Sequence, residues 1–146
     1  MSSNKESLRI RQTKNAKIIR TLEQACFPAD EPYDISGSIW WVAKVGDFPI
    51  AYAGLKPLPM EPEIGFLCRA GVLSNYRGHG LQRKFLKARE REAKKIGIKQ
   101  LITYTVVDNY PSIVNLISQG YRFYSPANPW AGKEAKSVLY FYKTLK

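Results

Sequence analysis

The most constraining stretch of the chain covers residues 67–97, where an apolar segment ends in a glycine-containing turn and an amphipathic segment follows. The apolar run ends at Leu73, and residues 74–80 have the composition of a turn. After the turn the apolar residues recur with helical spacing, at Leu81, Phe85, Leu86, Ala88, Ala93 and Ile96. This pattern predicts a strand, a tight turn and a long helix with a basic, solvated side. Gly97 is predicted to be the left-handed residue that ends the helix.

The turn in this stretch has the chemistry of an anion-binding site. Gly78 and Gly80 let a ligand approach the backbone closely, because glycine has no Cβ. The first N–H groups of the following helix have no partner inside the helix, and Arg77 adds a fixed positive charge. A Walker A loop is excluded because Gly-Lys-Ser/Thr is missing, and a dinucleotide fingerprint would need glycine at Arg83.

The hexad RGHGLQ at residues 77–82 resembles the acyl-CoA-binding motif of the GNAT-type N-acetyltransferases. The usual form of that motif is Arg/Gln-x-x-Gly-x-Gly/Ala after a β-strand, and Gln82 departs from it at the sixth position. The resemblance implies acetyl-CoA as co-substrate, with its pantetheine arm on the strand end and its pyrophosphate in the turn. The cofactor-binding residues that it implies here are Gly71, Val72, Leu73, Arg77, Gly78, His79, Gly80, Leu81 and Gln82.

A second segment, Asn109-x-x-Ser112 followed by Gly120-Tyr121, resembles the second motif of the same family. The resemblance implies that Asn109 and Ser112 flank the far end of the cofactor. Members commonly place a tyrosine in this segment, where it protonates the departing thiolate. The corresponding position in this chain is Leu116. No general acid is therefore assigned, although a thiol leaves readily without one.

Transfer to an amine also needs a base, because an alkylammonium group with a pKa near ~10.4 must lose a proton before it attacks. Glu63, at the start of the predicted fourth strand, is the candidate, since bases in this family often lie on that strand. The alternative is that Glu63 is a polar residue at the strand entry. The side chain of His79 is predicted to face solvent, and Cys68 to be buried without nucleophilic function.

The remaining chain predicts an α+β fold with a mixed sheet; the resemblance implies about seven mostly antiparallel strands flanked by helices. Three helices are expected: one capped by Thr13 or Asn15 and stopped at Phe27-Pro28, the long helix, and one capped by Asp108 or Asn109. Strands are predicted at residues 8–12, 38–45, 49–56, 63–73, 99–107, 121–124 and 137–142.

Two further patterns give expectations about packing and charge. Trp40 and Trp41 are neighbours in a predicted strand, so their side chains point to opposite faces and at most one is expected in the deep core. Residues 28–37 collect Asp30, Glu31 and Asp34 in an otherwise basic chain. This loop is either an acidic lip that attracts a cationic amine or an ordinary polar loop.

Length and composition limit the remaining possibilities. The 146 residues predict a flexible tail at residues 1–7 and one domain at residues 8–146. Two distant cysteines and one histidine predict no metal site, and the absence of an apolar leader predicts a cytoplasmic protein. The net charge of +11 suits attraction of an anionic cofactor. Nucleic-acid binding is not expected, because the basic residues are spread and no nucleic-acid-binding motif accompanies them.

The sequence thus predicts an N-acetyltransferase that uses acetyl-CoA and a primary amine, either a small amine or a protein or peptide amine. It is expected to act as a monomer or homodimer. The alternative is a GNAT-like module without catalysis that binds acyl-CoA or a polyanion.

Overall fold

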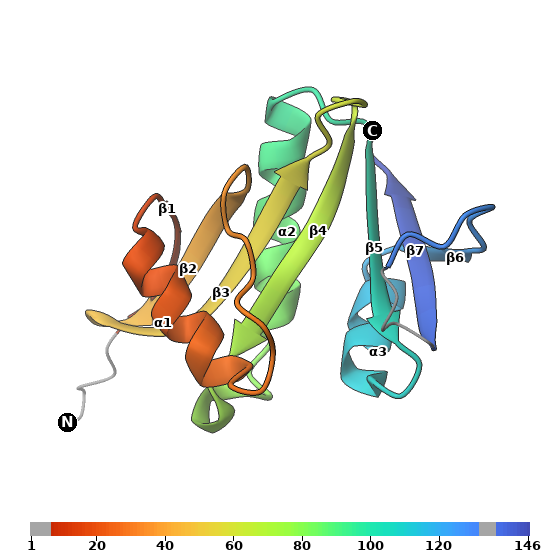
Figure 1. Cartoon of the computed structure of the whole chain (residues 1–146). Helices are drawn as coiled ribbons and strands as arrows, with labels where there is room; N and C mark the ends of the chain where they lie inside the picture. Colours follow the sequence, from red (N-terminus) through yellow and green to blue (C-terminus); the bar gives the residue numbers. More distant parts are fainter. Residues whose placement is uncertain (1–6, 132–136) are drawn as a thin grey trace. The chain divides into compact units, whose positions relative to one another are not determined.

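The structure, a computed structural model, describes residues 7–131 and 137–146 (Figure 1). The predicted tail at residues 1–7 and the predicted loop at residues 125–137 therefore lie partly outside the described residues. The chain divides into a first unit, Met1–Lys56 with Cys68–Phe85, and a second unit, Pro57–Leu67 with Leu86–Lys146. The elements are β1 (Leu8–Thr13), α1 (Ala16–Cys26), β2 (Ile39–Val45), β3 (Phe48–Pro57), β4 (Ile64–Val72), η1 (Ser74–Tyr76), α2 (Leu81–Lys95), β5 (Gln100–Val106), α3 (Tyr110–Ser118), β6 (Arg122–Tyr124) and β7 (Val138–Thr144).

The strands form one sheet in the order β1-β2-β3-β4-β5-β7-β6. β1 pairs with β2, β2 with β3, β5 with β7 and β6 with β7, all antiparallel, whereas β4 and β5 are parallel. The predicted mixed, mostly antiparallel seven-stranded sheet with helices is thus confirmed. The short 3₁₀ helix η1 was not predicted, because its three residues carry only a turn-like composition.

In the first unit, α1 begins where a side chain caps it. The side-chain oxygen of Asn15 accepts hydrogen bonds from the backbone N–H groups of Lys17 and Ile18, which makes Asn15 the cap. The hydroxyl of Thr13 instead accepts from the N–H of Asn15. Ile19 and Leu22 are buried on the side of α1 that packs on the sheet, as the apolar pattern predicts.

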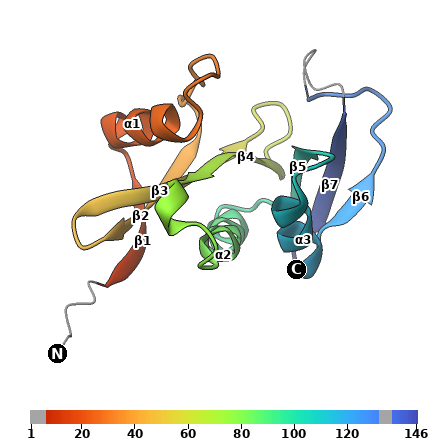
Figure 2. The ribbon, with the colours of Figure 1, turned by 90° about the horizontal axis from the view of Figure 1, so that it is seen from below.

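The expectation that only one of the two neighbouring tryptophans lies in the deep core is wrong. Trp40 and Trp41 are 6% and 4% exposed. In Figure 2, α1 lies on one side of β2 and β3. Four consecutive residues of β2, from Trp40 to Ala43, are buried, so both faces of this strand are covered and side chains are buried in either direction. The indole N–H of Trp40 donates to the carbonyl of Ile35 at 2.9 Å.

In the second unit, β5 pairs with β7 along its whole length, from Gln100–Thr144 to Val106–Val138. α3 is capped by Asn109, whose side-chain oxygen accepts from the N–H of Ser112 at 3.4 Å. Gly120 follows α3 with φ of +93°, in agreement with its predicted role as the end of that helix.

The exposure of residues along α2 differs from the predicted apolar stripe at Ile96. Leu81, Phe85, Leu86 and Ala93 are buried, but Ile96 is 44% exposed because α2 has already ended at Lys95. Arg89, which the sequence pattern assigned to neither side of the helix, is only 4% exposed. It follows Phe85 by four residues and therefore lies on the buried side of the helix. Gly97 has φ of +90°, which confirms the left-handed residue after α2.

Candidate functional site

The turn between β4 and α2 lies within the first unit and is held by backbone hydrogen bonds. The N–H of Leu73 donates to the carbonyl of Ile50 at 2.9 Å, which fixes the end of β4 against β3. The N–H of Tyr76 donates to Leu73, and the N–H of Arg77 to Ser74, so the chain first coils through η1. Gly78 and Gly80 then have φ of +82° and +76°. Other residues rarely adopt this conformation, so these two glycines make the turn possible.

α2 begins directly after the second of these glycines. Leu81 is 3% exposed and anchors the first turn of the helix, while Gln82 is half-buried. The N–H of Lys84 donates to the carbonyl of Gly80 at 3.2 Å, the start of the helical hydrogen-bond pattern. The preceding N–H groups lie at the positive end of the helix dipole, which favours an anion. His79 is exposed in the turn, as predicted for its side chain.

The side chain of Arg77 folds back toward the strand. Its Nε donates to the carbonyl of Val72 at 3.1 Å, and the residue as a whole is exposed. This bond closes the turn between the end of β4 and the residue before Gly78. A guanidinium carries five N–H donors, so Nη1 and Nη2 remain to bind an anion while Nε holds the turn.

Gly71 has a packing reason to be glycine. A Cβ at this position would lie 2.8 Å from the ring of Tyr52 and 2.9 Å from the side chain of Cys26. The sequence alone had suggested a ladder bulge or a close ligand at Gly71. Its contribution to cofactor binding stays a prediction, but the space beside it is already filled by α1 and β3.

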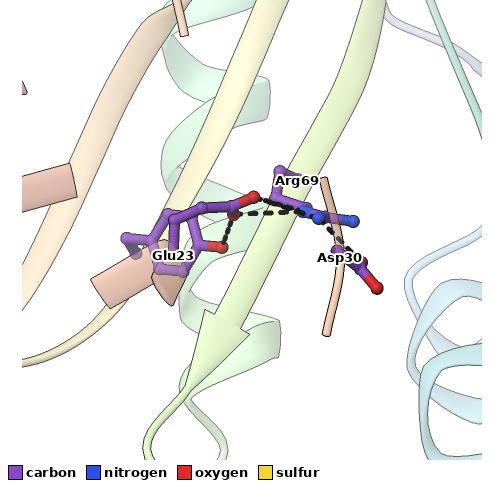
Figure 3. A network of polar contacts seen from close by, with 4 residues as sticks. Glu23, Asp30 and Arg69 are labelled. Carbon is purple, nitrogen blue, oxygen red and sulfur yellow. Dashed lines mark hydrogen bonds and ion pairs between the residues drawn. The ribbon is translucent and has the colours of Figure 1, made fainter. Parts of the chain in front are cut away.

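A network of charged and polar side chains joins α1, β3 and β4 in the first unit (Figure 3). The carboxylate of Glu23 accepts hydrogen bonds from the hydroxyl of Tyr52 and from Nε of Arg69, the latter at 3.0 Å to both oxygens. Burial, together with the hydrogen bond and negative charge of Glu23, raises the pKa of Tyr52 far above its usual range. Burial alone would lower the pKa of Arg69, but its bonds to Glu23 outweigh that effect and raise it.

Arg69 also reaches the loop that follows α1. Its Nη2 lies 2.8 Å from Oδ2 of Asp30, and its guanidinium carbon lies 4.1 Å from the ring centre of Phe27. The ring of Tyr33 is 5.5 Å away. The two rings supply cation–π contacts, which stabilise a partly desolvated guanidinium. Arg69 therefore ties the loop to β4.

The three acidic residues of the loop at residues 28–37 are used unequally. Asp30 pairs with Arg69, and Asp34 accepts hydrogen bonds from the hydroxyl and the N–H of Ser36. The side-chain hydrogen bond from Ser36 lowers the pKa of Asp34 below its usual range. Two of the three carboxylates thus have partners inside the loop or on β4, while Glu31 is exposed.

Glu63 precedes β4 in the second unit. Its carboxylate forms an ion pair with Lys99 at 3.0 Å, and both side chains are well exposed, at 63% and 72%. Its carbonyl accepts from the N–H groups of Lys99 and Gln100, which starts the parallel pairing of β4 with β5. Glu63 thus takes part in the strand entry, and its role as a base stays a prediction.

The tyrosines near the second motif have hydrogen-bond partners or lie on the surface. Leu116, at the position where the family commonly has tyrosine, is buried. Tyr121 donates to Glu90 at 2.8 Å, and burial and the Glu90 charge raise the pKa of Tyr121 far above its usual range. Tyr124 accepts from the indole N–H of Trp130, whereas Tyr110 is 68% exposed.

The predicted site residues fall into two groups. Gly71 to Gln82 lie together in the first unit, at the end of β4 and the start of α2. Asn109, Ser112 and Glu63 belong to the second unit. The Glu23–Arg69 network was missed by sequence analysis. Its one local signal is that Glu23 follows buried Ile19 by four residues, which places a carboxylate on the apolar side of α1.

Two general features of the described residues bear on function. Residues 7–131 and 137–146 contain no group of three or more His, Cys, Asp or Glu side chains placed to hold a metal ion. Within the same ranges, no helix has both the length and the apolar character needed to cross a membrane. Within these ranges neither Cys26 nor Cys68 forms a disulfide, and Cys68 is buried in the strand as predicted.

The fold is shared with solved acetyltransferase structures. The IAA acetyltransferase from Bacillus cereus is 18% identical, with a TM-score of 0.78 over 95% of this chain and 100% of that chain. A Bacillus subtilis acetyltransferase in complex with CoA is 16% identical, with a TM-score of 0.75 over 96% and 100%. The ribosomal-protein-S18-alanine N-acetyltransferase from Escherichia coli is 14% identical, with a TM-score of 0.75 over 95% and 94%. At these identities the likeness establishes the fold.

Sequence comparison assigns the family. No curated protein matches the chain significantly. A model of the acetyltransferase (GNAT) family matches residues 10–121, which is most of the chain and includes β4, the glycine turn and α3. The chain therefore belongs to the GNAT family of acetyltransferases.

Proposed function

We propose that this protein is an N-acetyltransferase that transfers the acetyl group of acetyl-CoA to a primary amine. Arg77 and the backbone N–H groups of residues 78–82 bind the diphosphate of the cofactor. Val72 and Leu73 pair with the pantetheine arm beside Gly71, and Asn109 with Ser112 flanks the far end of the cofactor. A structure of a related fold contains CoA, which supports this ligand for the family.

The observation that carries the proposal is the turn between β4 and α2. Two glycines with positive φ bring the backbone into a concave path directly before the first N–H groups of a fifteen-residue helix. Arg77 is held beside it by its bond to Val72. Free N–H groups, the helix dipole and a guanidinium with unused donors together favour a diphosphate.

The reaction needs only the cofactor, the acceptor and a proton acceptor. The lone pair of the neutral amine attacks the carbonyl carbon of the thioester, and a tetrahedral oxyanion forms. A backbone N–H near Val72, aimed at this oxygen, would stabilise the charge. The C–S bond then breaks, the thiolate of CoA departs with the electron pair, and the amine proton passes to a base. The products are the acetylated amine and CoA.

Glu63 is the proposed base, directly or through water. Its ion pair with Lys99 is exposed, so the pair contributes little energy and can open when a substrate arrives. No general acid is proposed, because Leu116 occupies the usual tyrosine position and cannot donate a proton. The thiolate then takes its proton from solvent.

Calorimetric titration with acetyl-CoA tests the binding step. Loss of a charge-assisted hydrogen bond costs about 1.5–3 kcal/mol, so Arg77→Ala is expected to weaken binding by roughly tenfold or more. Arg11→Ala on β1 is the matched control, since Arg11 is exposed and distant in sequence from the turn. Unchanged affinity in Arg77→Ala, or no heat with the native protein, would contradict the proposal.

One observation favours a second candidate function, a GNAT-like module that binds acyl-CoA, or a polyanion, without catalysis. Leu116 is buried where a tyrosine acid commonly stands, and the hydroxyl of nearby Tyr121 is bound to Glu90, while Tyr110 lies on the surface. Release of free thiol from acetyl-CoA in the presence of a panel of amines separates the two candidates. Tight binding without turnover on any amine supports the module.

A further inference from the structure

The inference concerns the acceptor and rests on the proposed transferase function. We propose that Arg69 recognises a carboxylate on the acceptor, so that the preferred substrates are amines that carry a carboxylate a few bonds away, as free amino acids do.

The guanidinium of Arg69 has N–H donors that its bonds to Glu23 and Asp30 do not use. Its bonds to Glu23 and Asp30 use Nε and Nη2, so in the described part of the chain the two N–H groups of Nη1 remain for a ligand. The side chain is 22% exposed, so this edge is accessible from solvent. The rings of Phe27 and Tyr33 lie near the guanidinium and limit its rotation. A planar guanidinium fixed in this way is suited to bind a carboxylate with two parallel hydrogen bonds.

The two carboxylates that now hold Arg69 differ in accessibility. Glu23 is 10% exposed and also accepts from Tyr52, so it is a permanent partner. Asp30 is 48% exposed, and its single contact with Nη2 is of the kind that contributes little in water. A carboxylate of the substrate can therefore take the place of Asp30 while Glu23 continues to orient the guanidinium.

The place of Arg69 on β4 connects it to the proposed cofactor site within the first unit. Residues two apart in a strand point to the same face, so Arg69 and Gly71 share the face that packs on α1. Tyr52 links the two positions indirectly, since its hydroxyl bonds to Glu23, the partner of Arg69, and its ring lies beside Gly71. Two residues of strand span about 7 Å. A carboxylate on Arg69 thus places the rest of a small acceptor near the strand end proposed for the thioester arm.

The surrounding charge does not oppose an anion. The carboxylates of Glu23, Asp30 and Asp34 in this region are matched by Arg69 and by Lys56 and Arg20, whose positive charges act on Asp34. Asp34 is moreover occupied by Ser36. Glu31, which is exposed, is the remaining carboxylate of the loop, so most but not all of the negative charge near Arg69 is compensated.

Pairs of matched acceptors test the inference. The kcat/KM for acetyl transfer is measured by thiol release for alanine against alaninamide, and for phenylalanine against phenylalaninamide. The amide has the less basic amine, so intrinsic reactivity at neutral pH favours the amide, and a preference for the acid reports recognition of the carboxylate. The native protein is expected to prefer the acid by about tenfold or more.

Two substitutions are expected to move this preference in opposite directions. Arg69→Gln should bring the acid-to-amide ratio of kcat/KM close to one. Arg69→Lys should give a ratio between those of the native protein and Arg69→Gln, because lysine keeps the charge but lacks the planar set of N–H donors. Asp30→Asn should raise the ratio several-fold, since it removes the competing carboxylate. Arg11→Gln, an exposed arginine on β1, is the control and should leave the ratio unchanged.

The outcomes that overturn the inference differ from those that overturn the function. A native protein that acetylates amides as well as acids, or an Arg69→Gln variant that keeps the ratio, overturns the inference and leaves the transferase proposal standing. Binding of acetyl-CoA without transfer to either member of any pair also overturns it. Absence of acetyl-CoA binding overturns both proposals. If Arg69→Gln fails to fold, an unchanged or lowered ratio in Asp30→Asn is decisive against the inference.

Discussion

Each unit of this protein contains a glutamate on a helix that accepts hydrogen bonds from a tyrosine hydroxyl and from a cation on a strand. In the first unit Glu23 binds Tyr52 and Arg69, and in the second unit Glu90 binds Tyr121 and Lys143. The two carboxylates are similarly shielded, at 10% and 13% exposure. The cations differ, and their remaining donors go to different kinds of partner.

Lys143 makes its further hydrogen bond to a backbone carbonyl, whereas Arg69 makes its further contacts to side chains of the loop after α1. Nζ of Lys143 donates to the carbonyl of Gln119 at 2.6 Å, and this residue ends α3. Arg69 instead contacts the side chain of Asp30 and the ring of Phe27. The lysine network therefore closes a helix end, and the arginine network leaves donors near the surface. A compact ammonium group suits the closing of a helix end, and a planar guanidinium with several N–H donors suits contacts near the surface.

The largest predicted effect comes from neutralising the two glutamates. Glu23→Gln should lower the free energy of unfolding by about 2–3 kcal/mol, because the nearby rings of Phe27 and Tyr33 limit how far the guanidinium of Arg69 can turn toward water. Glu90→Gln should cost about 1–2 kcal/mol, since the flexible Lys143 can turn to solvent or keep its bond to Gln119. Urea denaturation measures both. Glu92→Gln on the same helix is the control, and equal losses for Glu23 and Glu90 would remove the proposed difference between the two cations.

One glycine in each unit, Gly54 in the first and Gly120 in the second, extends the comparison of the two units from charge to packing. A Cβ at Gly54 would lie 2.6 Å from Sγ of Cys68 and 2.7 Å from the ring of Trp40, so Gly54→Ala should cost about 2 kcal/mol through overpacking. Gly120 in the second unit has φ of +93°, and the atom nearest to an added Cβ would be Cε of Lys143 at 3.6 Å. Gly120→Ala should cost about 1 kcal/mol from backbone strain alone.

A double substitution separates these two causes. Cys68→Ala removes the sulfur that a Cβ at Gly54 would strike, so it should recover part of the loss in Gly54→Ala and none of the loss in Gly120→Ala. Thermal or urea unfolding of the single and double variants gives the coupling. Additive losses for Gly54 and Cys68 would show that the steric account is incomplete.

The buried tyrosines predict a loss of stability in alkaline solution. The pKa values of Tyr52 and Tyr121 are raised in the folded protein, whereas an unfolded tyrosine titrates near pH ~10. Their contribution is thus fully present below pH ~10 and falls above it by about 1.4 kcal/mol per pH unit for each tyrosine. Tyr52→Phe and Tyr121→Phe should each remove the contribution of one tyrosine to the decrease of the unfolding free energy with pH. Urea unfolding between pH 9 and 11, about one unit on either side of that value, measures it, and a flat native profile would be contrary to expectation.

The smallest effect on stability is expected at the exposed pair Glu63–Lys99. Glu63→Gln should change the free energy of unfolding by less than about 0.5 kcal/mol, because exposed ion pairs contribute little. If Glu63 is the base, the same variant should lower kcat by roughly a hundredfold or more and alter the pH–rate profile. Lys99→Gln is the matched control for loss of the ion pair. Full activity in Glu63→Gln would exclude Glu63 as the base.

Local features of the molecule were accessible from sequence. The strands and helices follow from apolar periodicity and from side chains that act within a few residues. Asn15 caps α1, Gly97 ends α2 and Gly120 ends α3, each through the conformation of its own turn. The glycine turn at Gly78 and Gly80 belongs to the same class. Such features depend on neighbours in the chain, so the sequence contains most of the information that they require.

Features that depend on distant partners were missed or mistaken. Trp40 and Trp41 are both buried because both faces of their strand are covered, and their spacing within β2 does not indicate this. Arg89 is buried although its neighbours on α2 are exposed lysines and arginines. The pairing of Asp30 with Arg69, a residue 39 positions away in the chain, was also not foreseen when the loop was taken as either an acidic lip or an ordinary polar loop.

The sequence by itself determined the order of strands and helices, the motif that identifies the family, and the bend of the backbone proposed to hold a diphosphate. Each of these features depends on residues that are close to one another in the sequence. Only the tertiary structure decided which charged side chains are buried and which partners neutralise them. The reason is that a charge leaves water only when an opposite charge or a hydrogen-bond partner is brought to it. For Glu23 that partner, Arg69, comes from a strand 46 residues away.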